Sequence, residues 1–361
     1  MNRAQRLASN MGDLDAVVIL NGTEPFLDST FWYLTGLDSG SFEGSVAVVR
    51  KDGSLDLIVS QLEEEIAKGG NGDIHVYSKR DEFTEFVTIL LKDCKHVGFN
   101  THSVPYSGVQ GIKKICGDIE IEDASKCISD TVNVKDASEI ALIEKACRIT
   151  STVAEELPEM ISEGLSEKQV SSEMDIRMKR LGASGYAFDT IAAFGKYSAE
   201  PHHMPSDYKL RKGDTALFDF GAKFGGYCAD LTRTIFLGEP DAKLRKAYDI
   251  VREAQQAGID AMRPGAKASD VDRAARDIID SSEFKGLFIH SFGHGIGRDV
   301  HQNISVSPRS EQVLAEGNVV SAEPGIYIPG LGGIRIEDTM LITKDGCRRL
   351  TSFDHSFTVS R

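Results

Sequence analysis

The sequence predicts two domains, an α/β domain over residues 1–132 and an α+β domain with an internal pseudo-two-fold repeat over residues 133–361. Three observations lead to this prediction. Short apolar runs alternate with amphipathic stretches in the first third of the chain, a short polar linker follows, and the remainder repeats a pair of helices followed by an acidic hairpin. The 361 residues are enough to build two full hydrophobic cores.

The first domain is predicted from four apolar runs of strand length, at residues 15–20, 45–50, 55–59 and 96–100. Helices are expected near residues 61–68 and 82–92, so the order of elements favours a mostly parallel or mixed sheet. No predicted helix follows a GxGxxG or GxxxxGKS/T motif, and we therefore expect a scaffold or a lid over the substrate rather than a phosphate-binding domain. The single tryptophan, Trp32, lies in an aromatic run that is more typical of a packed patch or a subunit contact than of a substrate site.

The second domain is predicted to begin after a linker at residues 133–136. Apolar side chains then recur at helical spacing, which predicts a long helix. Two later stretches, residues 160–170 and 262–271, echo each other: in each, a helix ends near a glycine, and a serine, Ser166 or Ser269, is placed to cap the next helix. The echo predicts a duplicated unit whose halves close around one central site.

Five potential metal ligands lie in a fixed order in this domain. They are Asp219, Asp230, His294, Glu323 and Glu337. Residues 215–221 alternate as a strand and residues 227–234 return, so this hairpin can place the first two carboxylates on one face. Residues 319–323 and 334–338, joined by a glycine-rich turn, form a second predicted hairpin that carries the last two.

The chemistry of this set favours a pair of metal ions. Four carboxylates gathered in a half-buried sheet would repel one another and resist ionisation. Two divalent cations remove this penalty and leave room for a bridging hydroxide that attacks a carbonyl carbon. One imidazole among oxygen ligands favours manganese or cobalt, with zinc or iron as alternatives. A single aspartate on a strand is more often a surface charge, but Asp219 and Asp230 lie in apolar strands, where an unpaired carboxylate is costly.

Two histidines outside this set are candidates for contact with a substrate. His301 follows a glycine-rich stretch and can donate to a substrate carbonyl or to the charge that develops on it. His202 is either a second pocket histidine or a loop histidine exposed to solvent. His203 and His290 are interpreted as structural.

Two further residues are expected to support the ligands. Thr232 lies two residues beyond Asp230 on the same strand face, where its hydroxyl can orient a ligand oxygen. Arg335 lies two residues before Glu337 and shares its face, so it either holds a ligand carboxylate or meets a substrate carboxylate.

The composition argues against two classes of partner. The formal net charge is −14 and no basic stripe interrupts it, which disfavours nucleic acid. No apolar run approaches the roughly 20 residues that span a bilayer, and the first residues lack the apolar core of a signal peptide. Six scattered cysteines show neither disulfide nor zinc-knuckle spacing. We expect a cytoplasmic enzyme with reduced thiols.

The ligand segments resemble the motifs of the M24-like "pita-bread" metallopeptidases, a family that includes methionine aminopeptidase, Xaa-Pro aminopeptidase, prolidase and creatinase. The matching segments are residues 218–221, 229–234, 293–297, 323–327 and 332–338. The resemblance covers roughly residues 135–361, and the preceding part is similar, more loosely, to the extra domain of the prolidase, Xaa-Pro aminopeptidase and creatinase branches. It implies a creatinase-like N-terminal domain and a pita-bread catalytic domain.

The resemblance also implies a role for each ligand. Asp219 would bind one ion, His294 and Glu323 would bind the other, and Asp230 and Glu337 would bridge both. Glu323 would in addition shuttle a proton beside the bridging hydroxide.

The same resemblance implies an activity. His202 matches a family histidine that contacts substrate or intermediate, and His301 matches one close to the scissile carbonyl. The expected function is a dinuclear-metal exopeptidase that hydrolyses the Xaa-Pro peptide bond. The single small N-terminal domain and the short chain favour the prolidase-like and the short Xaa-Pro aminopeptidase-like branches. Of these, Xaa-Pro dipeptidase (prolidase) is preferred and Xaa-Pro aminopeptidase acting on longer peptides is the alternative. A non-catalytic binding protein or an enzyme for another amide is less favoured. A homodimer is expected from the resemblance.

Overall fold

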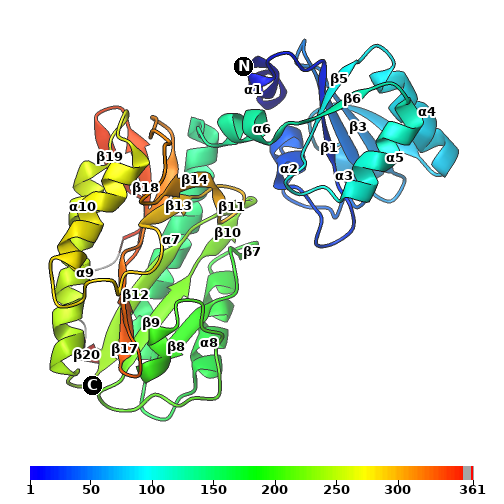
Figure 1. Ribbon diagram of the computed structural model, residues 1–361. Coiled ribbons are helices and arrows are strands. Elements are labelled where there is room, and N and C mark those ends of the chain that lie inside the picture. Colours follow the sequence, from blue (N-terminus) through cyan, green and yellow to red (C-terminus); the bar gives the residue numbers. More distant parts are fainter. Residues whose placement is uncertain (353–358, 361) are drawn as a thin grey trace. The chain divides into compact units, whose positions relative to one another are not determined.

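The chain forms two structural units in the computed structural model, which describes residues 1–352 and 359–360 (Figure 1). The units are Met1–Val132 and Asn133–Arg361, and each has hydrophobic clusters of its own. Among the described residues, no helix is both long enough and apolar enough to cross a bilayer.

The first unit is built on a six-stranded mixed sheet in the order β4-β3-β2-β1-β5-β6. Its strands are β1 (Ala16–Leu20), β2 (Val46–Arg50), β3 (Leu55–Ser60), β4 (Asp73–Tyr77), β5 (His96–Phe99) and β6 (Glu120–Asp123). Strand β2 is antiparallel to both its neighbours, and the other pairs are parallel. Val17 and Ile19 of β1 enter one apolar cluster and Val18 and Leu20 the other. This burial on two faces explains the uninterrupted apolar run of β1.

The helices of this unit are α1 (Arg3–Asn10), α2 (Ser29–Thr35), α3 (Glu64–Ala67), α4 (Arg80–Leu91), α5 (Tyr106–Cys116) and α6 (Ser125–Val132). The helix predicted near residues 82–92 corresponds to α4, whereas the one near residues 61–68 is reduced to the single turn of α3. Strands β4 and β6 escaped prediction because they are polar edge strands without an apolar run. The aromatic run around Trp32 is packed: Phe31 is fully buried against Phe42, with ring centroids 4.9 Å apart.

The second unit contains two helix pairs and the strands that they cover (Figure 1). The helices are α7 (Ala137–Met160), α8 (Glu167–Arg180), α9 (Ala242–Ala261), α10 (Ala268–Asp280) and the 3-10 helix η1 (Gly195–Ala199). One sheet has the order β20-β12-β9-β8, with strands β8 (Ile191–Phe194), β9 (Thr215–Phe220), β12 (Leu231–Leu237) and β20 (Val359–Ser360). A second sheet has the order β14-β13-β15-β18-β19, with strands β13 (Gly293–Gly295), β14 (Gln302–Val306), β15 (Val319–Ala322), β18 (Asp338–Thr343) and β19 (Gly346–Arg349). The remaining strands are β7 (Gly185–Tyr186), β10 (Ala222–Phe224), β11 (Tyr227–Cys228), β16 (Gly325–Ile328) and β17 (Gly332–Arg335).

The two halves of this unit repeat one arrangement. Helices α7 and α8 pack their apolar faces on β8, β9 and β12, and α9 and α10 do the same on strands of the second sheet. Isolated β-bridges join Ser166 to Lys209 and Lys267 to Val313. Ser166 and Lys267 are the N-cap residues of α8 and α10, the second helix of each pair. Ser166 caps α8 in a capping box, as predicted, but the expectation for Ser269 is wrong. Helix α10 already begins at Ala268, so this serine lies inside its first turn.

Each predicted acidic hairpin is broken into two paired segments. The first runs out through β9 and β10 and returns through β11 and β12, and the second runs out through β15 and β16 and returns through β17 and β18. The predicted pairing of residues 334–338 with residues 319–323 as one continuous hairpin is therefore wrong in detail. Strand β15 pairs with β18, and β16 pairs with β17. Asp230, Glu323 and Glu337 lie in the breaks. Residues at these breaks are outside the hydrogen-bonded strand ladder, so their carboxylates can turn toward a common point.

Candidate metal centre

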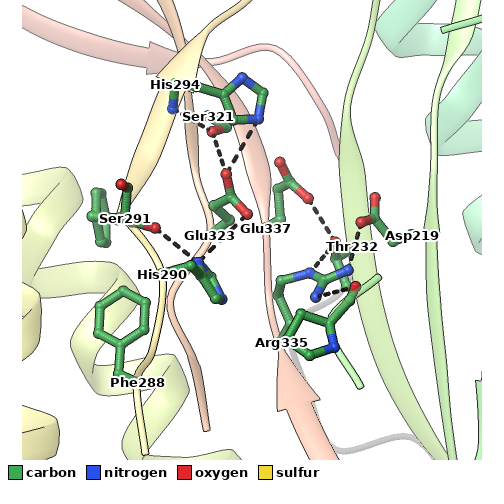
Figure 2. A network of polar contacts seen from close by, with 12 residues as sticks. Asp219, Thr232, Phe288, His290, Ser291, His294, Ser321, Glu323, Arg335 and Glu337 are labelled. Carbon is green, nitrogen blue, oxygen red and sulfur yellow. Dashed lines mark hydrogen bonds and ion pairs between the residues drawn. The ribbon is translucent and has the colours of Figure 1, made fainter. Parts of the chain in front are cut away.

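The predicted ligands and histidines line one cavity of about 430 Å³ in the second unit. Asp219 comes from β9, His294 from β13, and Asp230, Glu323 and Glu337 from the hairpin breaks. Figure 2 shows the Glu323 carboxylate next to the His294 ring, with Glu337 beside it and Asp219 farther away, beyond Thr232. Side chains from both halves of the repeat thus meet in one place.

The central group is Asp230, His294 and Glu337, which offer ligand atoms that all lie within 4.8 Å of one another. His294 Nε2 is 3.5 Å from Asp230 Oδ2 and 3.2 Å from Glu323 Oε1. The other ring nitrogen, Nδ1, lies 3.2 Å from the carbonyl oxygen of Gly295. That contact places a proton on Nδ1 and leaves Nε2 as the ring nitrogen that faces the carboxylates, where it donates to Glu323 or would ligate a cation.

Three buried carboxylate oxygens have no hydrogen-bond partner within the part of the chain that the structure describes. They are Asp219 Oδ1, Asp230 Oδ1 and Glu337 Oε1. A buried polar atom without a partner costs free energy, and an unpaired charge costs more. Three such atoms beside one imidazole are what a cation-binding site looks like without its cation, so the residues present fit a metal.

The electrostatics of the site lead to the same conclusion. Burial, and after it the charge of Glu337, raises the pKa of Asp230 well above its ordinary value. Burial and the charge of Glu323 raise the pKa of Glu337 in the same way. Glu323 differs, because the hydrogen bond and charge of His294 outweigh its burial and lower its pKa. Divalent cations would reverse the first two shifts by neutralising the cluster.

Thr232 and Arg335 support the ligands directly. The Thr232 hydroxyl donates to Glu337 Oε2 at 2.6 Å and accepts from Arg335 Nε at 3.1 Å. Arg335 Nη2 donates to Asp219 Oδ2 at 2.5 Å, and Nη1 donates to the Tyr327 hydroxyl at 2.8 Å. Of the two roles predicted for Arg335, these contacts match the holding of a ligand carboxylate. Thr232 lies directly opposite Asp219 in the ladder of β9 and β12, which is why one arginine reaches both.

Gly293 explains how His294 reaches the cluster. A Cβ atom on Gly293 would lie 2.1 Å from the Ser321 carbonyl oxygen, so only glycine lets β13 approach β15 this closely. The approach lets the His294 amide donate to Ser321 Oγ at 2.9 Å, and Ser321 Oγ donates in turn to Glu323 Oε1 at 3.0 Å. Sequence reasoning did not find Ser321, whose role depends on this contact between strands.

His290 was interpreted as structural, yet it lines the cavity. Its Nδ1 lies 4.0 Å from Glu323 Oε2 (Figure 2). Its Nε2 is 2.8 Å from the Tyr327 hydroxyl. Burial lowers its pKa. The signal was present in the sequence, because the even spacing from His290 to His294 in an extended segment puts both side chains on one side.

His202 and His301 lie on the cavity wall. The His301 ring packs edge-on against His294 with centroids 4.3 Å apart, and burial together with the charge of His294 lowers its pKa. His202 is exposed and follows Pro201, whose carbonyl accepts from Arg335 Nη1 at 3.3 Å. His203 is buried between Glu167 and Glu200, which fits the structural interpretation.

Comparisons with known proteins agree with this geometry. The model of metallopeptidase family M24 matches residues 141–344, and that of the creatinase/prolidase N-terminal domain matches residues 2–131. The chain is 38% identical to a Xaa-Pro dipeptidase of Pyrococcus horikoshii over 94% of this chain and 93% of that protein. The crystal structure of a prolidase from P. horikoshii superposes with a TM-score of 0.91 at 36% identity, covering 99% of each chain. The crystal structure of an X-Pro aminopeptidase from Thermotoga maritima superposes with a TM-score of 0.89 at 31% identity, covering 99% of this chain and 100% of that one.

Proposed function

Because the chain belongs to metallopeptidase family M24 and carries a creatinase/prolidase N-terminal domain, we propose that it is a Xaa-Pro dipeptidase, a prolidase. The predicted two-domain fold class and the metallopeptidase assignment are confirmed by these matches and by the prolidase structures. The observation that carries the function is the set of three partnerless carboxylate oxygens next to His294. That set fits divalent cations, and the relatives that cover most of this chain include a Xaa-Pro dipeptidase.

The proposal assigns five metal ligands. Asp219, Asp230, His294, Glu323 and Glu337 would hold two divalent cations, with Asp230 and Glu337 shared between them. When bound, such cations lower the pKa of water and polarise a carbonyl group. Manganese or cobalt suits this oxygen-rich set best, with zinc or iron as alternatives.

Glu323 is assigned the proton transfer. Its Oε1 is occupied by His294 Nε2 and Ser321 Oγ, which leaves Oε2 for exchange with water or with the leaving nitrogen. The lowered pKa of Glu323 keeps it ionised at neutral pH, so it begins as the proton acceptor.

His301 and His202 are assigned to the substrate. The lowered pKa of His301 keeps its imidazole neutral at neutral pH, and a neutral imidazole can still donate one N–H to a substrate carbonyl oxygen. His202, exposed on the cavity wall, would orient the same part of the substrate.

One observation favours the second candidate, Xaa-Pro aminopeptidase activity. Arg335 is the one lysine or arginine among the described residues that line the cavity, and its guanidinium already holds Asp219. A dipeptidase needs a cation for the substrate's free carboxylate, whereas an aminopeptidase does not. The X-Pro aminopeptidase from T. maritima shares the fold.

A paired assay separates the two candidates. The metal-loaded protein is given a Xaa-Pro dipeptide, a Xaa-Pro-Xaa tripeptide and a dipeptide without proline, and its metal content is measured in parallel. The proposal predicts that the Xaa-Pro dipeptide is cleaved with the highest kcat/KM. Preference for the tripeptide would replace it with the aminopeptidase, and cleavage of none of them would remove both.

The proposal includes a cytoplasmic homodimer. The six cysteines are free thiols, three of them buried, which is typical of a reducing compartment. The dimer rests on the resemblance alone. Sedimentation as a monomer at micromolar concentration would exclude it.

A further inference from the structure

The loop at residues 200–206 is fixed on both sides of His202. Before it, the Pro201 carbonyl accepts from Arg335 Nη1 at 3.3 Å. After it, His203 is buried, with Nδ1 2.8 Å from Glu200 Oε2 and Nε2 2.9 Å from Glu167 Oε2. His202 itself is exposed and lines the cavity. A side chain with two anchored neighbours has only its own rotamers left to choose.

Glu167 is the centre of this anchorage. It lies at the first position of α8 and is 0% exposed. Its Oε1 accepts from the Phe194 amide at 2.8 Å, and its Oε2 accepts from the Ser206 amide at 2.8 Å, from Ser206 Oγ at 2.6 Å and from His203 Nε2. The carboxylate therefore ties a helix, the end of β8 and the loop together. It is also favourably placed near the positive end of the helix dipole.

A buried carboxylate with this many contacts needs a reason, because burying such a group is costly even when it is fully hydrogen-bonded. Glu167 does not line the metal cavity, so it contacts neither ion nor substrate. The loop that it holds has one cavity-lining imidazole, His202. The ring of His203 stacks on Tyr197 with centroids 5.2 Å apart, which further restricts the loop.

We propose that Glu167, acting through His203 and Ser206, is a positioning residue that sets the orientation of His202 toward the substrate. This inference rests on the proposed function, in which His202 contacts substrate. It predicts that the effect of changing Glu167 passes through His202 and disappears when His202 is absent.

The pseudo-two-fold repeat supplies a matched control. Asp272, on α10, is also 0% exposed and accepts from the Phe292 amide at 3.0 Å, as Glu167 accepts from the Phe194 amide. Its carboxylate otherwise holds Arg276, which donates to the carbonyls of Phe288 and His290. Asp272 thus has the same burial and a similar backbone-amide contact, but it holds a different segment.

The test is a double-mutant cycle on the metal-loaded protein with a Xaa-Pro dipeptide. Glu167→Gln is expected to lower kcat/KM by about 10–100-fold, the range usual for residues that orient a catalytic group. In a His202→Ala background the same change is expected to cost less than about 2-fold, because the group it orients is gone. Any loss of kcat/KM caused by Asp272→Asn is expected to be the same in the wild-type protein and in His202→Ala. Metal content and thermal unfolding are measured for every variant.

If Glu167→Gln lowers kcat/KM by the same factor with and without His202, the two effects are independent and the inference is overturned. Wild-type kcat/KM in Glu167→Gln would overturn it as well. If Glu167→Gln does not fold, Ser206→Ala removes one donor of the same anchor and enters the same cycle. If the wild-type protein cleaves no Xaa-Pro bond, the proposed function fails, and the inference is then decided by NMR of the His202 imidazole. Its resonances must move in Glu167→Gln and not in Asp272→Asn, and unchanged resonances overturn it.

Discussion

At the scale of single residues, the site is defined by carboxylates that are buried without enough partners. Asp230 is 4% exposed and Glu337 is 1% exposed, and each leaves one oxygen without a hydrogen bond in the described chain. Like charges at this depth disfavour ionisation of both groups. Cations are the simplest way for both to be ionised together.

Replacing Asp230 tests this directly. Asp230→Asn keeps the shape and removes the charge, so we expect metal affinity to fall by more than about 100-fold, beyond the range usual for outer-shell changes. Activity on Xaa-Pro substrates should fall with it. The measurement is metal content after dialysis together with kcat. Full turnover with unchanged metal content would contradict the assignment.

Thr232 offers a finer test. Thr232→Val removes the hydroxyl that donates to Glu337 and accepts from Arg335, and should lower metal affinity by about 10–100-fold. Thr234→Val is the control, because Thr234 lies on the same strand, is also buried, and its hydroxyl hydrogen-bonds to the backbone of Arg335 rather than to a proposed ligand. The expected order of metal affinity is wild type, then Thr234→Val, then Thr232→Val. A reversed order would show that burial rather than ligand orientation matters.

The gathering of the five proposed ligands in one cavity could be predicted from the sequence, because carboxylates in apolar strands are rare and chemically demanding. The sequence could not decide whether Arg335 holds a ligand carboxylate or meets a substrate carboxylate, because both roles need an arginine on the same face. Ser321 and Tyr327 also escaped, because their contacts join strands whose pairing no local pattern specifies.

At the scale of elements, the breaks in the two hairpins decide where the ligands point. The first break needs Gly221, where a Cβ atom would lie 1.8 Å from the Ala229 carbonyl oxygen, and β13 needs Gly293 beside Ser321 in the same way. The glycine at each place allows a close strand approach that any side chain would prevent.

Gly293→Ala should therefore weaken both stability and metal binding. Overpacking at this contact is expected to lower the free energy of unfolding by about 1–3 kcal/mol. Gly346→Ala is the control, because a Cβ atom there has no heavy atom within 4 Å. Denaturant unfolding and metal titration of both variants check this. Equal effects of the two changes would argue against a close approach at Gly293.

The loop beside α8 should make stability depend on pH. Burial lowers the pKa of His203, but the hydrogen bonds that its ring donates to Glu167 and Glu200 outweigh the burial, and the net pKa is raised. The ring also faces Tyr197. A raised folded pKa contributes stability that is complete below the unfolded value of about 6.5 and is lost as pH rises through the folded pKa.

The measurement is the difference in unfolding free energy between wild type and His203→Gln as a function of pH. We expect this difference to be largest below about pH 6.5 and to shrink above it. A difference that grows with pH would mean that His203 is held neutral instead.

Element prediction succeeded where a strand is buried on both faces, as in β1, and where a helix is capped, as at Ser166. It failed for β4, β6 and the hairpin breaks. Edge strands carry too few apolar residues to stand out, and a break depends on which strand lies beside which, so neither leaves a local pattern.

At the scale of the whole molecule, the catalytic unit is a duplication that brings two kinked hairpins to one point. Asp230 and Glu337 occupy matching breaks on the return arms of the two hairpins. Each half also has a buried carboxylate, Glu167 or Asp272, that accepts from a backbone amide. The repeat was visible in the sequence as an echo of helix ends, and the family matches extend over both units. The fold therefore supplies both the proposed metal ligands and the side chains proposed to orient them.

Metal should stabilise the whole unit. Chelator treatment is expected to lower the unfolding temperature, and added manganese or cobalt should restore it. The gain in the free energy of unfolding is about 2.7 kcal/mol when free metal is 100 times the dissociation constant. Asp230→Asn should gain much less from the same addition. Equal stabilisation of the variant would mean that the ions bind elsewhere.

The most direct test of the central claim is the number of ions that the protein holds. Metal-free protein is titrated with manganese and the bound metal per chain is counted, together with Xaa-Pro hydrolysis at each point. We expect saturation at about two ions per chain, with activity appearing as the site fills. Activity that is complete in metal-free protein, or a chain that takes up no ion at the carboxylate cluster, would contradict it.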